Sequence, residues 1–139
     1  MTVGEKQAET GTAVPPQVLD GPFSTRQLLR IDEALRLADQ GTGLVFSVYV
    51  GHFDEDEPTR IYTERLHRQL AEPDKSVLIA VSPNQRQLEI VTGKYARKRI
   101  PDTYARLAAL SMVASFGGGD LAGGIIQGLD QLASHAGKG

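Results

Sequence analysis

Residues 74–102 are DKSVLIAVSPNQRQLEIVTGKYARKRIPD, and their pattern predicts a β-hairpin followed by a basic loop. Residues 77–81 form an apolar run, which is typical of a strand that is buried on both faces. Residues 87–91 alternate between polar and apolar side chains, as a strand with one exposed face does. Residues 82–86 are turn-forming, so they join the two runs as antiparallel strands.

The two ends of this hairpin are expected to lie side by side. A turn centred between residues 84 and 85 sets the register, and it pairs Val81 with Leu88, Ser76 with Gly93 and Asp74 with Tyr95. A register slip of two residues would shift these pairs without separating the ends. One short segment therefore places an aspartate beside the basic loop.

Two helices and another strand precede the hairpin. A capping box at residues 24–27 begins a helix that is expected to stop at Gly41. Residues 43–50 are rich in β-branched and aromatic side chains and are predicted to be an interior strand. A second helix is expected from Pro58 to about Leu70, where the next proline breaks it.

Two more helices follow the basic loop. The first opens at Pro101 and is predicted to turn Leu107, Leu110 and Ala114 toward the core, and the second begins after the N-cap Asp120. The predicted order is therefore α-β-α-β-β-α-α. A strand, a helix and a buried strand in succession imply a parallel crossover. We expect the α/β class, as a three-layer α/β/α sandwich around a small mixed sheet.

Length and composition fit one ordinary globular core. The chain has 139 residues, of which 40% are hydrophobic, and we expect a single domain over residues 22–136. Residues 1–21 are rich in Thr, Gln, Glu, Gly and Pro, and they are predicted to be a disordered lead-in. Neither a secretory signal nor an apolar run of about 18 residues occurs, so we expect a soluble cytoplasmic protein without a membrane span.

The charge balance and the cysteine count exclude several classes of function. The net charge of −2 gives no general attraction to nucleic acid, and no basic stripe with interleaved aromatic residues indicates a nucleic-acid partner. There is no cysteine, which excludes disulfides, zinc-thiolate sites and thiol catalysis. Any binding of anions must therefore be local.

The basic loop is the candidate anion site, and its cations are Lys94, Arg97, Lys98 and Arg99. Such a cluster can hold a phosphate, with help from amides at the start of the helix that opens near Pro101. The alternative is a solvated loop whose cations neutralise nearby acidic residues.

Asp74 and Asp102 are the candidate metal ligands, because the hairpin and the loop after it can bring them together. Two carboxylates with backbone carbonyls can hold Ca²⁺ or Mg²⁺. The alternative is local: Asp74 is a turn residue, and Asp102 is an acidic residue in the first turn of a helix, where it favours the helix dipole.

The chain resembles the TPM domain family, which includes a thylakoid acid phosphatase, and more closely an actinobacterial branch of it known only as a domain of unknown function. The resemblance covers about residues 23–135. It is carried by Asp74 before the apolar strand at 77–81, by residues 88–93, by Pro101 with Asp102, and by residues 116–120 with the glycine-containing helix after them. It implies an α/β/α sandwich, and a site that is associated with divalent cations and, in some members, with phosphatase activity.

The chain departs from the family pattern within that site. Asp74-Lys75-Ser76 stands where the family usually has Asp-Asn-Gly, Tyr95 stands at the second glycine of a Gly-x-Gly pattern, and Arg97 stands where an acidic residue is common. Added cations repel a divalent ion and favour an anion.

We therefore predict a TPM-like, non-enzymatic binding module for an anionic ligand or a protein partner, with no required cofactor. The alternative is a weak phosphomonoesterase in which Asp74 and Asp102 hold Ca²⁺ or Mg²⁺ and Lys94, Arg97 or Arg99 neutralises phosphate oxygens. A third hypothesis is a partner-binding module that uses the last helix, whose glycines, including Gly124, favour close packing.

Overall fold

The structure is a computed structural model that describes residues 22–138, so the lead-in predicted for residues 1–21 lies outside the described residues. The elements are α1 (Thr25–Thr42), β1 (Val45–Val50), α2 (Thr59–Arg68), η2 (Pro73–Lys75), β2 (Ser76–Ser82), β3 (Gln87–Thr92), α3 (Ala96–Arg99), α4 (Asp102–Gly117) and α5 (Leu121–Ala136). The predicted order is confirmed. The short 3-10 turn η2 and the one-turn helix α3 are additions to it.

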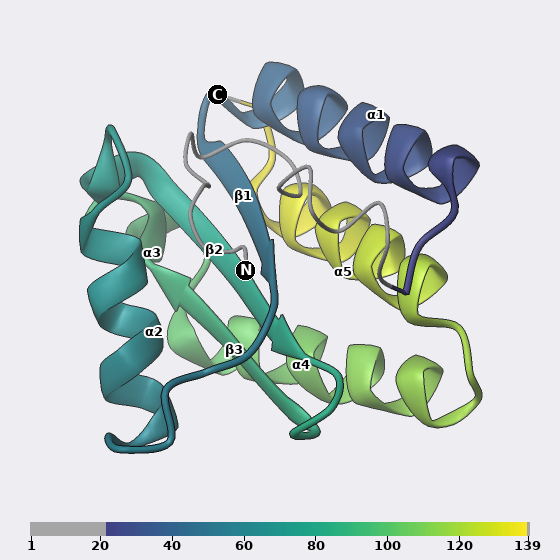
Figure 1. Ribbon diagram of the computed structural model, residues 1–139. Helices are drawn as coiled ribbons and strands as arrows, with labels where there is room; N and C mark the ends of the chain where they lie inside the picture. Colours follow the sequence, from purple (N-terminus) through teal and green to yellow (C-terminus); the bar gives the residue numbers. More distant parts are fainter. Residues whose placement is uncertain (1–21, 139) are drawn as a thin grey trace.

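The sheet is small and mixed, with the strand order β1-β2-β3. β2 pairs with β1 in parallel and with β3 antiparallel. Helices α1, α4 and α5 cover one face, and α2 covers the other (Figure 1). The α/β class is therefore confirmed, in layers of helix, sheet and helix.

The interior position predicted for the first strand is wrong, because β1 lies at an edge of the sheet. Its side chains are nevertheless buried or half-buried on both faces. Helices pack on both faces of the sheet, so an edge strand here carries the apolar pattern that sequence reasoning assigns to a central one.

The register of the hairpin is as predicted. Val81 lies opposite Leu88. At the other end, the amide of Gly93 donates to the carbonyl of Ser76 at 2.9 Å. The amide of Tyr95 donates to the carbonyl of Asp74, also at 2.9 Å, so the hairpin does bring the residues before and after it together.

Helix α1 begins with the predicted capping box and ends later than predicted. The amide of Gln27 donates to Ser24 Oγ at 3.1 Å, and Gln27 Oε1 accepts from the amide of Ser24 at 2.8 Å. The left-handed stop is Gly43, with φ of 79°, and not Gly41. Thr42 Oγ1 donates to the carbonyl of Ala38 at 2.7 Å, which keeps the last turn helical.

Because Gly41 lies inside α1 and a Cβ there would meet no atom within 4 Å, the glycine is not required. Gly41→Ala is expected to raise the free energy of unfolding by about 0.5 kcal/mol, since alanine loses less backbone entropy in a helix. Urea unfolding followed by circular dichroism measures the change. A loss of more than about 1 kcal/mol would contradict the open environment of Gly41.

The predicted inner face of α4 is wrong. Leu107 and Leu110 are 50% and 64% exposed, and Ala114 is exposed too. The face that packs on the core instead presents smaller or flexible side chains, Ala105, Ala108 and Met112.

The glycines of α5 explain this choice. A Cβ on Gly124 would lie 2.7 Å from a ring carbon of Phe116, and a Cβ on Gly128 would collide with the sulfur of Met112. Helices α4 and α5 therefore approach closely, and leucine would not fit between them. The close packing predicted for these glycines is between two helices of this chain.

Candidate functional site

The candidate site is the basic loop together with the first turns of α4. Gly93 ends the hairpin, and residues 94–99 then carry the four predicted cations on and around α3. Lys94, Arg97 and Lys98 are exposed, and Arg99 is half-buried. The four cations therefore lie in different environments.

Arg99 is directed into the molecule. Its guanidinium donates to the carbonyl of Thr42 at 3.0 Å, to that of Ala136 at 3.1 and 3.3 Å, and to that of Gly137 at 2.8 Å. These carbonyls end α1 and α5, where helices leave acceptors unsatisfied. Arg99 thus ties two helix ends together, and few of its donors are left for a ligand.

Arg97 is fixed locally. Its Nη2 donates to the carbonyl of Thr92 at 2.8 Å, and its Nε lies 3.8 Å from a carboxylate oxygen of Asp102. Thr92 is at the end of β3, whose outer side pairs with no other strand in the sheet. The arginine therefore satisfies an edge carbonyl and joins the strand end to the start of α4.

Lys94 and Lys98 are the available cations of the loop. Neither side chain makes a hydrogen bond or an ion pair with another residue in the described range 22–138. An exposed ammonium without a fixed partner can turn toward an incoming anion. The part of the predicted site that remains open to a ligand is therefore Lys94 and Lys98, with Arg97 between them.

The two candidate metal ligands lie in different surroundings. Asp74 is exposed on η2, beside Lys75, whereas Asp102 is exposed and faces Arg97. Within residues 22–138, no group of three or more His, Cys, Asp or Glu side chains is placed to hold a metal ion. Two exposed carboxylates, each next to a cation, do not fit a site for Ca²⁺ or Mg²⁺.

A cavity of about 320 Å³ lies where α2 and the outer side of β3 meet α4. Its charged lining residues are Arg60, Glu89, Asp102 and Arg106. Arg60 donates to Glu89 at 3.0 Å, to Glu64 at 3.0 Å and to the carbonyl of Ile90 at 3.0 Å.

Burial lowers the pKa of Arg60, but its hydrogen bonds to Glu89 and Glu64 more than offset this, and the net pKa lies above the usual value. Sequence reasoning missed Arg60 and Glu89 as neighbours of the site. The outward position of Glu89 on an alternating strand could have indicated that Glu89 lies near the site. Nothing in the sequence of α2 indicates the same for Arg60.

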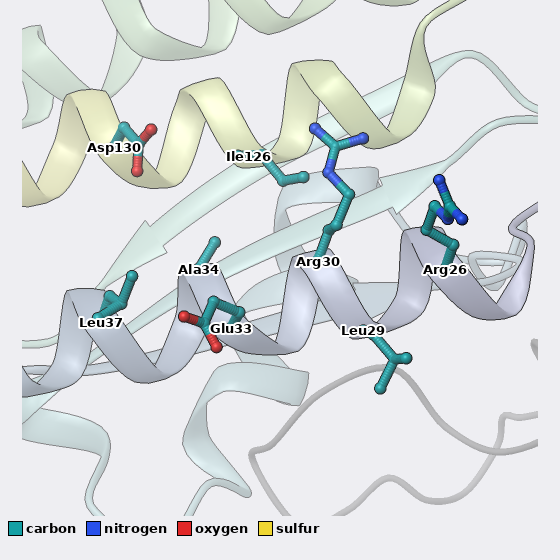
Figure 2. A pocket seen from close by; sticks show the side chains of 8 residues that line it. All are labelled: Arg26, Leu29, Arg30, Glu33, Ala34, Leu37, Ile126 and Asp130. Atoms are coloured by element: carbon teal, nitrogen blue, oxygen red, sulfur yellow. The ribbon is translucent and has the colours of Figure 1, made fainter.

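A shallow groove of about 480 Å³ lies between α1 and α5 (Figure 2). Arg26 and Arg30 lie toward one end of it, and Asp130 lies at the other, across from Leu37. Leu29 points away from α5. Because charges of both signs are spread along this groove and do not converge, it offers no defined binding point.

Comparison with known protein families assigns the chain to one of them. The family described as a domain of unknown function (DUF5130) matches residues 8–133. The chain belongs to this family. Two similar relatives are the uncharacterized protein Rv2468c of Mycobacterium tuberculosis H37Rv and the uncharacterized protein MT2543 of strain CDC 1551. Each is 30% identical over 113 residues, which are 81% of this chain and 66% of the relative. The chain therefore spans just under two thirds of these relatives.

Solved structures share the fold at low sequence identity. The N-terminal domain of a protein from P. gingivalis has a TM-score of 0.72 at 19% identity, with 94% of this chain and 92% of that one covered. The N-terminal domain of the cg2496 protein from Corynebacterium glutamicum has a TM-score of 0.69 at 16% identity, over 96% and 84%. The BA42 protein from Bizionia argentinensis has a TM-score of 0.67 at 16% identity, over 82% and 81%. At such identities the likeness concerns the fold alone, and the resemblance to the TPM family stays a prediction.

Proposed function

We propose that residues 22–136 form a single, TPM-like, non-enzymatic domain that binds an anionic ligand at the basic loop. The observation that supports this most is the segregation of charge. Residues 90–119 contain five cations and one acidic residue, a net charge of +4, which leaves −6 for the rest of the chain. Local charge of one sign attracts an anion even when the whole chain is slightly acidic.

The contacts of the loop support the same function. Arg97 and Arg99 are held by backbone carbonyls, so they stiffen the loop, while Lys94 and Lys98 stay free for a ligand among the described residues. A stiff loop loses little conformational entropy when a ligand binds. The cytoplasm remains the location that we expect, and no helix within residues 22–138 is long and apolar enough to cross a membrane.

The rival function, a metal-dependent phosphomonoesterase, has less support. It needs Asp74 and Asp102 to share a cation, yet Asp102 faces Arg97 at 3.8 Å. The positive charge that surrounds these acids favours an anion over a cation.

A titration with inorganic phosphate, followed by the amide signals of the ¹⁵N-labelled chain, tests the proposal. Shifts are expected for residues 93–99, and Lys94→Gln/Lys98→Gln is expected to weaken binding about tenfold, since two charge-assisted contacts are lost. The matched control is Arg26→Gln/Arg30→Gln, which removes two exposed cations in the N-terminal part of α1, about 24 and about 18 Å along the helix from Thr42. An equal loss in the control, or shifts spread over the whole chain, would argue against a local site.

A further inference from the structure

Helix α4 carries an apolar stripe on its outer surface. Leu107, Leu110 and Val113 are 50%, 64% and 52% exposed, whereas the ring of Tyr104 stacks on that of His135 in α5. The three aliphatic residues are among the eight large hydrophobic side chains that are exposed within residues 22–138. In Figure 1, α4 lies along a margin of the molecule, with α5 and the sheet on its inner side. A run of exposed apolar side chains on one helix indicates a surface that meets something other than water.

The cation Arg106 lies beside this stripe. It precedes Leu110 by four residues and Val113 by seven, so all three share one side of the helix. Arg106 is exposed. After Asp102, the helix contains no acidic residue as far as its end at Gly117. The outer surface of α4 is therefore apolar, with the positive charge of Arg106 beside it. Asp102, the first residue of the helix, is its only acidic residue.

The basic loop extends this surface at the N-terminal end of α4. Two residues separate α3 from α4, and the contact of Arg97 with Asp102 links the loop to the first turn of the helix. Lys94, Lys98 and Arg106 are then available cations at one end of the apolar stripe. A helix that lies in a membrane interface combines these two properties, with apolar side chains at the acyl boundary and cations near anionic headgroups.

We propose that α4 and the basic loop dock on the surface of an anionic phospholipid bilayer. Leu107, Leu110 and Val113 enter the boundary between headgroups and acyl chains, and Lys94, Lys98 and Arg106 lie against the phosphates. This inference rests on the proposed function, since it names the source of the anion. A bilayer fits better than a protein partner because the stripe is a convex helix surface of aliphatic side chains, whereas protein hot spots favour Trp, Tyr and Arg in pockets.

Vesicle flotation with the full chain tests the proposal, with vesicles of phosphatidylcholine alone and of roughly equal parts phosphatidylcholine and phosphatidylglycerol. We expect binding to the anionic vesicles only, weakened by high salt. Lys94→Gln/Lys98→Gln is expected to lower the partition coefficient about 25-fold, at about fivefold for each lost cation. Leu107→Ser/Leu110→Ser leaves the charge unchanged and is expected to lower it about tenfold.

The matched control is Leu29→Ser/Leu37→Ser, because these leucines of α1 are equally exposed, at 65% and 54%. Thermal melting of each variant verifies that it is folded. Binding that is lost with the α4 pair and kept with the α1 pair supports docking through α4. An equal loss of vesicle binding in both double variants would overturn docking through α4. Vesicle binding that is unchanged in the α4 double variant would overturn it too.

The remaining outcomes separate this inference from the proposed function. Phosphate shifts at residues 93–99 without binding to anionic vesicles would overturn the membrane inference and leave the anion site standing. The absence of both phosphate shifts and vesicle binding would overturn the membrane inference and the proposed function together. A concentration-dependent dimer in sedimentation, abolished by Leu107→Ser/Leu110→Ser and accompanied by no vesicle binding, would assign the stripe to a second copy of this chain and overturn the bilayer.

Discussion

Gly93→Ala is expected to lower the free energy of unfolding by about 3 kcal/mol, the upper end of the usual cost of overpacking a core. A Cβ at position 93 would lie 2.6 Å from the carbonyl oxygen of Asp74, and it would also collide with the carbonyl oxygen of Pro73. Both obstacles are backbone atoms of η2, so no side-chain rotation relieves the contact. Urea unfolding, with the slope checked for two-state behaviour, measures the loss.

The surrounding hydrogen bonds prevent an easy adjustment at Gly93. Its amide donates to the carbonyl of Ser76, and two residues later the amide of Tyr95 donates to that of Asp74. Moving the chain away from η2 would break both bonds. Gly41→Ala is the control, because a Cβ there meets nothing. If Gly93→Ala were as stable as this control, the close approach of the loop to η2 would be refuted.

The hairpin was predictable because its determinants are local. Two apolar runs joined by a short turn allow few registers, and the burial of residues 77–81 selects among them. The pairing of Val81 with Leu88 and the position of Asp74 next to Tyr95 followed from this alone. Local signals also identified the capping box of α1.

The inner face of α4 was not predictable from its own sequence. Periodicity favours Leu107 and Leu110 as core residues, but the face is chosen by Gly124 and Gly128 of α5, which bring the two helices too close for leucine. A hydrophobic pattern contains no information on the distance to the next helix. The two leucines that periodicity assigns to the core, Leu107 and Leu110, are part of the exposed stripe of α4.

The candidate site was predictable as a cluster, but the direction of each side chain was not. Lys98 and Arg99 are adjacent cations in the sequence, and nothing local distinguishes them. Arg99 turns inward because the carbonyls of Thr42 and Ala136, which are 57 and 37 residues away in the sequence, end their helices beside it. Only the tertiary arrangement brings these acceptors to the loop.

Arg99→Lys is expected to lower the free energy of unfolding by about 2 kcal/mol while it leaves phosphate binding at the basic loop within about twofold. Lysine keeps the positive charge, and thus the electrostatic attraction to an anion and to the carbonyl ends of α1 and α5. Its single ammonium cannot replace the planar fork that reaches Thr42, Ala136 and Gly137 together. Urea unfolding and the phosphate titration are carried out on the same samples.

The neighbouring variant Lys98→Gln should give the opposite result, because the side chain of Lys98 is exposed and makes no hydrogen bond or ion pair within residues 22–138. Its stability should stay within about 0.5 kcal/mol of the parent chain, while phosphate affinity falls about threefold or more. The two variants together separate a cation that holds the fold from one that meets the ligand. If Arg99→Lys kept its stability and lost phosphate binding, Arg99 would be a ligand-binding residue, and the site would again include all four cations of the loop.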